Sequence, residues 1–424
     1  LESNFYNASF YLNLLVKSKK RIYQKEEMLS LSKRISHLLS VIVCLGSINF
    51  AKVQAHTIIP ANDGTATIVT PDGKRFDITG VTLSKDGANL FHSFQKFGVN
   101  ADQIANFLSN PQIRNILGRV IGGDASVVNG LIQVTGGNSN LYLMNSAGFI
   151  FGPNAQINVP ADFTVTTANG IQFDEQWFNA VGTNNYANLI GNPDGFAFTM
   201  VQPGGIINAG SLSVNPGQNL TLLGGSILNT GELSASEGQL IITAVPGKNL
   251  VRITPKGSPL SLEVSPFVAN NNQPNNVSFP IASLPELLTT GNTGYELGAT
   301  VNPDGTIKLK VSDVTVPGEP GTSIIAGKLD VSGQTGGKVG AFGNQVGVVG
   351  ANIDASGTNG GGTVLIGGDY KGQGNVPNAL RTFVSRDSVI NANAITDGDG
   401  GKVIVWADKA TRFYGDINAR GGLN

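Results

Sequence analysis

The sequence has 424 residues, of which 13% are charged, and its 28 lysines and arginines nearly balance its 29 aspartates and glutamates. This balance, with no basic run after residue 55, argues against a nucleic-acid-binding protein. Glycine and proline together make up about 18% of the chain, against a usual share of roughly 12%, while the apolar share of 40% is ordinary. This composition is typical of an ordered, extended all-β protein with many turns.

The first 55 residues differ from the rest of the chain. Basic residues are followed by the apolar run Ile35–Ile48 and by the small-residue end Val53-Gln54-Ala55, the order found in secretory signal peptides. The apolar run, about 14 residues long, is shorter than the ~20 needed to span a bilayer. We predict that residues 1–55 are a leader with translation from Met28 and cleavage after Ala55. Residues 1–27 are then either an extended leader or translated upstream sequence.

Cys44, the only cysteine, lies inside the apolar run of the leader. We therefore expect the exported chain to contain no disulfide and no thiolate metal site. From His56 onward, 20 lysines and arginines stand against 26 aspartates and glutamates, a net charge near −6. Such mild acidity disfavours binding to nucleic acid or to anionic membranes.

Residues 56–88 contain short alternating apolar runs separated by turn signals. The separators are Asn62-Asp63-Gly64 and Pro71-Asp72-Gly73, whose residues adopt tight-turn geometry readily. We predict β-hairpins or edge strands that form an N-terminal β cap on a longer β structure.

Residues 89–118 are the one long segment with a helical pattern. Leu90, Phe91, Phe94 and Phe97 fall at i, i+1, i+4 and i+7, and a later Asn-Pro pair separates them from a second apolar run. We predict helical turns whose aromatic stripe packs as an apolar plug against the first β elements.

Residues 138–159 alternate short apolar groups with turn-forming residues. The groups, each too short for a helix, are Leu141 with Leu143, Phe149–Phe151, and Ile157 with Val159. Asparagine, serine, glycine and proline separate them, and these residues tolerate corner geometry. The pattern predicts strand, corner, strand, as in a chain that winds into coils.

A true internal repeat follows. The eleven residues that begin at Leu212 recur from Leu233, so that Gly217 matches Gly238 at the same step of 21 residues. A step near 20 with short strands is too short for a two-helix repeat. It fits one turn of a parallel β-helix, whose strands stack on those of the next coil.

The rhythm breaks over residues 246–321, which we predict to be an insertion. A short helix is expected at Ser283–Leu288 and a hairpin at Thr300–Val311 around an Asn-Pro-Asp-Gly turn.

Glycine-rich coils resume over residues 322–424. Leu329 and Ile353 begin matching pieces 24 residues apart, and Ile395 and Ile417 begin related pieces 22 apart. The sequence stops in mid-repeat, so we expect these repeats to be truncated and the natural protein to continue.

Two asparagine motifs lie within a dozen residues, at Asn138-Ser139-Asn140-Leu141 and Asn145-Ser146-Ala147-Gly148-Phe149. With the signal peptide and the β cap, they resemble the filamentous haemagglutinin N-terminal domain. This is the secretion domain of large two-partner-secreted exoproteins of Gram-negative bacteria and cyanobacteria. The family usually has proline where this chain has Ser139 and Ser146, and asparagine where it has Ala147.

The resemblance covers residues 56–245, which we predict to be the secretion domain, and the coils from Leu329 resemble repeats of cyanobacterial members. It implies a right-handed parallel β-helix that is recognised by the periplasmic POTRA-type domains of an outer-membrane β-barrel transporter and folds outside the cell. The family's motif corresponds in this chain to Asn138, Asn140, Leu141, Asn145, Gly148 and Phe149.

We expect the asparagines to act structurally, because asparagine favours tight corners and can bond to the backbone there. Direct contact of Asn140 or Asn145 with the transporter is the alternative. Ser139→Pro or Ser146→Pro is expected to be tolerated. The resemblance also implies an adhesin-like exoprotein at the cell surface, with host or neighbouring-cell glycans or proteins as possible partners.

No catalytic constellation stands out in the sequence, so we predict no enzyme, no cofactor and no metal. His56 and His92 lack a second ligand, and we predict satisfied surface or interface histidines. The Gly-Gly-Lys ends of Gly333–Lys338 and Asp397–Lys402 are interpreted as solenoid corners rather than phosphate loops. Asp397-Gly-Asp399 matches the calcium-binding nonapeptide repeat only in a single copy.

Two rival functions stay open. One is a polysaccharide-active β-helix enzyme, since Asp330 and Asp354 occupy equivalent positions of neighbouring repeats and could stack on one face. The other is an autotransporter passenger, which would need a C-terminal barrel.

Overall fold

The computed structural model describes residues 57–253, 262–268, 273–290 and 294–423. The chain divides into two units, Leu1–Gln54 and Ala55–Asn424. The predicted signal peptide and His56 lie outside the described residues, and the fold is that of the second unit by itself.

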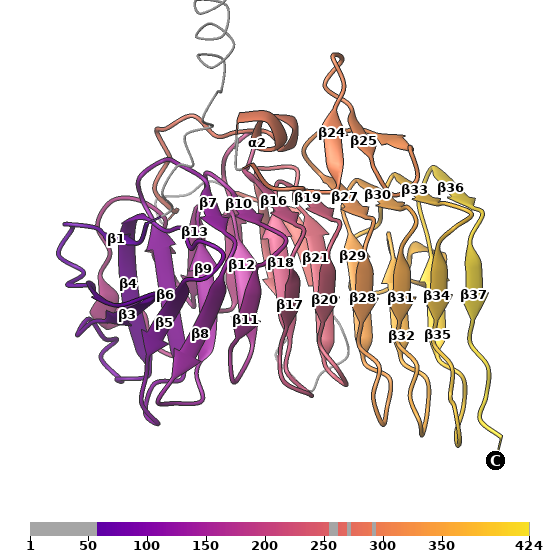
Figure 1. The fold of residues 1–424 in the computed structure, drawn as a ribbon, viewed down its shortest axis with the longest axis horizontal. Helices are drawn as coiled ribbons and strands as arrows, with labels where there is room; N and C mark the ends of the chain where they lie inside the picture. The colour runs from indigo at the N-terminus through magenta and orange to yellow at the C-terminus, as the bar shows by residue number, and fades with distance from the viewer. Residues whose placement is uncertain (1–56, 254–261, 269–272, 291–293, 424) are drawn as a thin grey trace, which may run out of the picture. The chain divides into compact units, whose positions relative to one another are not determined.

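Three mainly parallel sheets run side by side through this unit (Figure 1). From β6 onward, each coil passes through a first sheet (sheet A), then a second (sheet C) and a third (sheet B), before it returns to sheet A one strand further along. This is the parallel β-helix that the 21-residue repeat predicts, with the right-handed crossover usual for parallel strands.

The strands of sheet A, in sheet order, are β1 (Ile59–Pro60), β4 (Asn89–Lys96), β6 (Asn115–Val120), β9 (Asn140–Met144), β12 (Phe163–Thr166), β18 (Leu220–Gly224), β21 (Gln239–Ala244), β29 (Lys338–Phe342), β32 (Thr363–Ile366) and β35 (Lys402–Val405). Sheet C contains β7 (Ser126–Val128), β10 (Phe149–Phe151), β16 (Gly205–Asn208), β19 (Ser226–Asn229), β27 (Thr322–Ile325), β30 (Gln345–Val348), β33 (Arg381–Val384) and β36 (Ala410–Phe413). In both sheets each strand after the first is parallel to its predecessor, except that β1 is antiparallel to β4.

Sheet B contains β2 (Ile68–Asp72), β3 (Arg75–Thr79), β5 (Ile104–Leu108), β8 (Leu131–Thr135), β11 (Gln156–Asn158), β17 (Ser211–Ser213), β20 (Glu232–Ser234), β28 (Lys328–Asp330), β31 (Asn352–Asp354), β34 (Val389–Asn391) and β37 (Asp416–Asn418). Its first two strands form an antiparallel hairpin at the N-terminal end of the stack. The hairpin expected within residues 56–88 is therefore confirmed.

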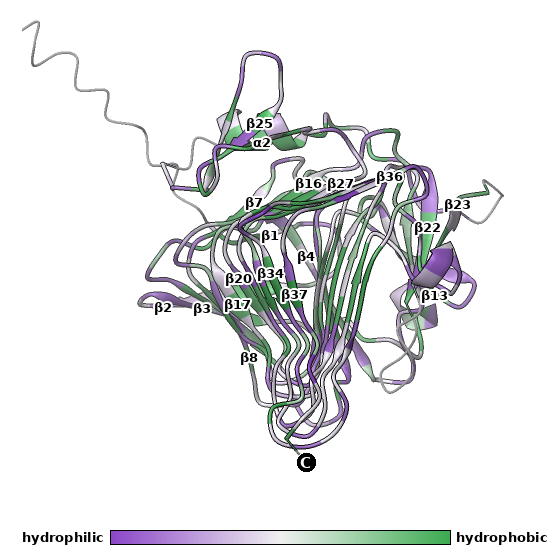
Figure 2. Ribbon diagram, turned by 90° about the vertical axis from the view of Figure 1, so that its right-hand side faces the viewer, coloured by the Kyte–Doolittle hydropathy of each residue, from purple (hydrophilic) through white to green (hydrophobic). Residues whose placement is uncertain are grey.

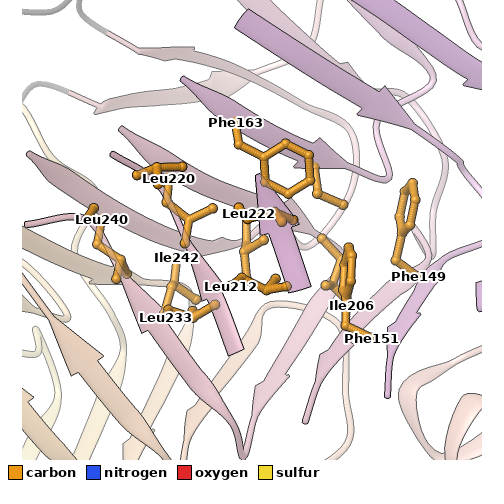
Figure 3. Close-up of a cluster of buried hydrophobic side chains, with 14 of the residues drawn as sticks. Phe149, Phe151, Phe163, Ile206, Leu212, Leu220, Leu222, Leu233, Leu240 and Ile242 are labelled. Carbon is orange, nitrogen blue, oxygen red and sulfur yellow. The ribbon is translucent and has the colours of Figure 1, made fainter. Parts of the chain in front are cut away.

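Apolar side chains fill the interior between the three sheets. Alternation with period two sends every second residue of a strand inward, and one contiguous cluster extends from Ile58 to Ala392. Figure 3 shows part of it, where Phe149 and Phe151 from β10 lie near Ile206, Leu212 and Leu222 from the next coil.

The helix expected over residues 89–118 is wrong, because this segment forms strands β4, β5 and β6. On β4, Leu90 and Phe94 point into the interior, whereas Phe91 joins a second apolar cluster outside sheet A with Phe173 and Phe178. Both faces of β4 are buried, so its apolar residues are nearly continuous, and such a run mimics a helical stripe. The predicted apolar packing of this segment on the first coils is present, but strands and not helical turns form it.

Two extra-helical segments leave the stack at the same corner, between sheet A and sheet C. The first carries β13 (Gly170–Phe173), β14 (Gln176–Asn179), the 3-10 helix η1 (Tyr186–Asn188) and β15 (Gly195–Phe198). Antiparallel pairing of β15 with β22 (Asn249–Ile253) joins it to the second segment, which also supplies β23 (Leu262–Pro266) to this five-stranded sheet.

The second segment continues with helix α2 (Leu284–Thr290) and a three-stranded sheet of β24 (Ala299–Val301), β25 (Ile307–Leu309) and β26 (Thr315–Val316). Figure 2 shows α2 and β25 on the side of β16 and β27, and β13, β22 and β23 on another side. The predicted helix and hairpin are confirmed. Ser283 and Glu286 bond reciprocally to each other's backbone N–H, a capping box that starts α2.

The strand register tests the repeats expected from the sequence. Leu212 pairs with Leu233 and Leu329 with Ile353, as expected. The match of Ile395 with Ile417 is wrong, because Ile417 stacks on Ile390 while Ile395 is 61% exposed in the following turn. The coils differ in length, and a second 3-10 helix, η2 (Tyr370–Gly372), lengthens one of them. A repeat of constant length therefore does not predict which residues pair in the later coils. Within the described residues, no helix is long and apolar enough to cross a membrane.

Candidate functional site

The first asparagine motif starts β9 and joins three successive coils. Asn89, Asn115 and Asn140 occupy the same register position on β4, β6 and β9. The Asn140 amide nitrogen donates to Asn115 Oδ1 at 2.9 Å, and that of Asn115 donates to Asn89 Oδ1 at 2.7 Å. These bonds form an asparagine ladder along the stack.

The ladder extends into the next coils through other polar groups. The backbone N–H of Asp162 donates to Asn140 Oδ1 at 3.1 Å, and the Asn219 amide donates to the Asp162 carboxylate at 3.1 Å. At the other end, Asn89 donates to the backbone oxygen of Leu189 in the first extra-helical segment. Because each rung bonds only to a neighbour in the correct register, a slip of one residue breaks several bonds at once. Sequence reasoning missed Asn89 and Asn115, although both directly precede apolar strand residues, as Asn140 does.

The other members of the first motif differ in burial. Asn138 is exposed in the turn before β9, whereas Leu141 is fully buried between Ile116 and Phe163 of the adjacent coils. Ser139 is fully buried, and its hydroxyl donates to the backbone oxygen of Ile113 at 2.6 Å. The motif therefore anchors one corner on the preceding coil.

The second motif forms the corner between β9 and β10. Asn145 is fully buried, and its amide donates to the backbone oxygen of Asp124 and to the Ser126 hydroxyl, each at 2.9 Å. Its Oδ1 accepts the N–H of Ala147 at 3.0 Å, and its backbone oxygen accepts the N–H of Gly148. One side chain thus closes its own turn and ties it to the coil before.

Gly148 and Phe149 complete this corner. Gly148 has a φ of +118°, and an added Cβ would lie 2.9 Å from the backbone oxygen of Gly205 and 3.1 Å from the Leu287 side chain on α2. Only glycine fits such a backbone beside a neighbouring coil. Phe149 is fully buried and its ring stacks on that of Phe151, with centroids 6.0 Å apart.

Ser146 changes one expectation. Its hydroxyl is buried and donates to the backbone oxygen of Ala168 on the following coil at 3.0 Å. Ser139 bonds likewise to Ile113, so each serine in a family proline position links two coils. Full tolerance of proline at either site is no longer expected, because proline removes the hydroxyl that makes the link.

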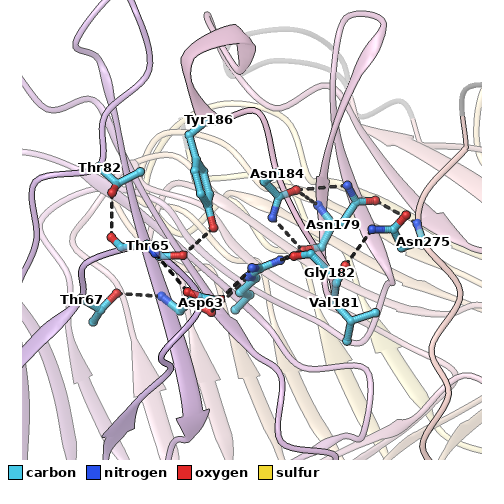
Figure 4. Close-up of polar contacts among 12 residues, drawn as sticks. Asp63, Thr65, Thr67, Thr82, Asn179, Val181, Gly182, Asn184, Tyr186 and Asn275 are labelled. Carbon is cyan, nitrogen blue, oxygen red and sulfur yellow. Dashed lines mark hydrogen bonds and ion pairs between the residues drawn. The ribbon is translucent and has the colours of Figure 1, made fainter.

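A charged centre that the sequence did not reveal lies near the N-terminal end (Figure 4). The Arg119 side chain is 1% exposed and pairs with Asp63 at 2.8 Å. It also donates to Ser93 Oγ at 3.1 Å and to the backbone oxygens of Asn179 and Gly182, each at 2.8 Å. Figure 4 labels its partners Asp63, Asn179 and Gly182. The centre therefore joins the N-terminal cap, the first coils and the first extra-helical segment.

Hydrogen bonds hold the Asp63 carboxylate in its charged form. Burial by itself raises the pKa of Asp63, but bonds from Ser93, Thr65 and Arg119 outweigh that effect and lower the pKa to about 2.

His92 contradicts the expectation of a satisfied surface or interface histidine. It lies on β4 within the core, its ring near those of Phe94 and Phe107, and neither ring nitrogen has a hydrogen-bond partner. Burial lowers the pKa of His92 to about 3, so the ring is neutral at ordinary pH. Gly80 leaves room for the ring, because a Cβ added there would lie 3.2 Å from His92 Cε1.

The two aspartates on which the enzyme hypothesis rests, Asp330 and Asp354, occupy equivalent positions of neighbouring coils, as predicted. Asp330 pairs in register with Asp354, but each carboxylate accepts the N–H of the serine two residues later, at 3.0 and 2.9 Å. Asp330 also pairs with Lys328 at 2.9 Å. Both therefore close turns in sheet B, and no group of three metal-ligating residues occurs in the part of the chain that the structure describes.

The Gly-Gly-Lys sequences are corners between sheets B and A, as predicted, since Lys338 and Lys402 begin β29 and β35. An added Cβ on Gly336 or Gly401 would lie 2.0 or 2.1 Å from a backbone oxygen of the adjacent turn. Close coil packing, not phosphate binding, explains these glycines.

The family model described as the TPS secretion domain matches residues 56–284, more than half of the chain. Among solved structures, the HMW1 secretion domain from Haemophilus influenzae is 20% identical, with 87% of this chain and 90% of that chain covered and a TM-score of 0.44. A filamentous hemagglutinin secretion domain is 14% identical, with 86% and 99% covered and a TM-score of 0.29. No curated protein matches the sequence.

Proposed function

The chain belongs to the TPS (two-partner) secretion domain family, and from this membership we propose that its two asparagine motifs carry the secretion signal. The chain contains the N-terminal secretion domain of an exported two-partner-secretion exoprotein. The partner such a domain implies is an outer-membrane β-barrel transporter. The proposed signal comprises Asn138, Asn140, Leu141, Asn145, Gly148 and Phe149.

The observation that carries this proposal is the bonding of Asn145. Its side chain closes one corner and at the same time bonds to Asp124 and Ser126 of the coil before. A coil that can close only on a formed neighbour adds to the stack in sequence order, and each addition releases free energy locally. Folding outside the cell then favours passage through the transporter without nucleotide.

The route proposed is export across the inner membrane by Sec after cleavage at Ala55, followed by recognition by POTRA-type periplasmic domains. Asn140 and Asn145 act through the folded corners on this route. Direct contact with the transporter is the alternative, and it would require their amides to be free in the recognised state.

We further propose that residues 56–245 form the secretion domain proper, with 246–321 as an insertion and 322–424 as repeats. The pairing of β15 with β22 supports tight packing of the insertion on the secretion domain. The family consists of secretion domains and is not an enzyme family. We propose that this chain has no catalytic activity, which agrees with the turn-closing roles of Asp330 and Asp354.

Export of the full chain in a Gram-negative host, with and without the co-encoded transporter, tests the proposal. We expect secretion only with the transporter, and loss of secretion when its periplasmic domains are deleted. Secretion that persists without the transporter would overturn the two-partner assignment.

Asn140→Ala distinguishes the structural role from direct contact, with exposed Asn158 on β11 as the matched control. We expect Asn140→Ala to lower both the unfolding temperature and export, and Asn158→Ala to change neither. Reduced export with unchanged stability would favour direct contact.

A further inference from the structure

The outer face of sheet C changes character along the stack. One outward column on successive coils consists of apolar residues that pack beneath α2 and β24–β26, namely Val127, Ile150, Ile207, Leu228 and Ile324. The same column continues with Gly347, Phe383 and Arg412. Phe383 is partly exposed and Arg412 is exposed. The covered apolar face therefore ends and an open surface begins.

A groove of about 490 Å³ lies at this transition. One wall is the segment 314–317, which includes β26, and the floor is formed by β27, β30, β33 and β36. A second outward column on the floor runs through Thr322, Gln345 and Arg381. The groove thus crosses four coils, whose strands are spaced by about 4.8 Å.

Thr322 points to a missing polar ligand. Its side chain is 2% exposed, its Oγ1 has no hydrogen-bond partner, and the residue lines the groove. A buried hydroxyl without a partner costs free energy, so native structures nearly always satisfy it. A hydroxyl group of a ligand in the groove would supply the missing hydrogen-bond partner of Thr322 Oγ1.

Two guanidinium groups lie near the other end of the floor. Arg381 and Arg412 are exposed and diagonal to each other on β33 and β36. Neither takes part in any ion pair found within the described residues. The nearby acid, Glu319, accepts the Gln345 amide at 3.4 Å. The guanidinium fork matches a carboxylate with two parallel bonds.

An aromatic surface adjoins the arginines. The rings of Phe383 and Tyr414 lie 6.0 Å apart and are tilted by 58°. Gly347 beside them leaves a hollow, because an added Cβ would meet only the Val349 side chain, at 3.9 Å.

We propose that this groove binds an acidic polysaccharide whose sugar rings bear carboxylates. A pyranose ring offers an apolar C–H face to Phe383 and a hydroxyl rim to Thr322 and Gln345. Its carboxylate pairs with Arg381 or Arg412. A sugar ring offers an apolar face and hydroxyls together with its carboxylate, so the combination of Phe383, Thr322 and the two arginines favours a glycan over an acidic peptide.

This inference rests on the proposed function only in placing the groove outside the cell, where such polymers occur. Binding is measured on purified protein, so its failure does not bear on export. Loss of export, in turn, does not bear on the groove.

Calorimetric titration of the full chain with galacturonate oligosaccharides tests the proposal, with neutral dextran and poly-glutamate as comparison probes. We expect galacturonate to bind and dextran not to bind. Arg381→Ser with Arg412→Ser should weaken binding at least tenfold, and Thr322→Val several-fold. Gly347→Phe should abolish binding, because the ring fills the hollow.

Arg386→Ser with Lys409→Ser is the matched control, since it removes the same charge outside the groove. Unchanged affinity in this control supports the site. An equal loss there, or undiminished binding by Gly347→Phe at an unchanged unfolding temperature, would overturn it. Equal binding of poly-glutamate with the same dependence on the arginines would also overturn it, in favour of an acidic peptide.

Discussion

The coils from β4 to β21 and those from β27 to β37 share one fold but are held together differently. In the first group, phenylalanine rings fill much of the interior as far as Phe163, and buried side chains such as Asn145 and Arg119 bond from coil to coil. In the second, small and β-branched residues fill the interior. Paired glycines there bring the corners into backbone contact, and an added Cβ on Gly362 would lie 2.1 Å from the Gly337 oxygen.

The difference teaches that register can be specified in two ways. Side-chain hydrogen bonds that fit only one partner specify which coil packs on which. Glycine corners instead allow any coil of similar shape to be added. The first kind suits a segment with a unique signal, and the second suits a repeat that extends an existing stack.

Truncation of the core should show the largest contrast. Phe149 and Val346 occupy the same inward column of sheet C. We expect Phe149→Ala to lower the free energy of unfolding by about 4 kcal/mol, and Val346→Ala by only about 1.5 kcal/mol, since fewer buried methyl groups are lost. Urea unfolding measures both, and equal losses would remove the contrast.

The buried charge should matter nearly as much. Arg119→Met leaves Asp63 and two backbone oxygens without their partner, at a cost of about 3 kcal/mol. The matched pair in the later coils, Lys402 with Asp369, is partly exposed, with 51% and 23% of the two side chains accessible, so Lys402→Met should cost less than about 1 kcal/mol. Thermal unfolding of the two variants gives the comparison, and a smaller loss for Arg119→Met than for Lys402→Met would contradict it.

Acid should destabilise the first group of coils selectively. Because the folded state keeps the pKa of His92 near 3, below its ordinary value of 6.5, the unfolded chain binds a proton that the folded chain does not. Stability is therefore full above pH 6.5 and falls by about 2 kcal/mol between pH 6.5 and 4.5. Asp63, with its pKa lowered to about 2, adds a further loss only as the pH falls below about 4.

His92→Leu should abolish the loss between pH 6.5 and about 4.5. Hydrogen exchange measured at both pH values locates the effect, which we expect at β4–β6 and not at β29–β35. A pH dependence that persists in the variant would assign the effect to other groups.

Replacement of Ser146 should give the smallest effect. Ser146→Ala removes the bond to Ala168 and should cost about 1 kcal/mol. Ser146→Pro loses the same bond but restricts the unfolded chain, so it should be more stable than the alanine variant by roughly 0.5 kcal/mol. Denaturant midpoints give the order of stability. A proline variant much less stable than the alanine variant would mean that this corner differs in conformation from the corresponding corner of the family.

The sequence predicted the features that depend on local chemistry. Turn residues around Gly73 and Gly305, and the 21-residue step from Leu212 to Leu233, correctly indicated hairpins and stacked coils. The step from Ile395 to Ile417 failed, because coil lengths vary with the turns.

Tertiary burial explains most of the remaining differences. β4 resembled a helix because the extra-helical sheet buries its outer face too. Asn89, Asn115 and Arg119 were missed because their partners lie on other coils, more than 20 residues away in the sequence. The six motif residues stay a proposal until export of their variants is measured.

Export of Asn145→Ala beside Asn391→Ala tests the central claim most directly. Both asparagines bond to a neighbouring coil, but Asn391 lies in the later group, where it accepts the Asn418 amide at 3.0 Å. With the transporter present, we predict that Asn145→Ala lowers secretion at least tenfold and that Asn391→Ala leaves it unchanged. Equal secretion of the two variants would contradict the claim that the first coils hold the secretion signal.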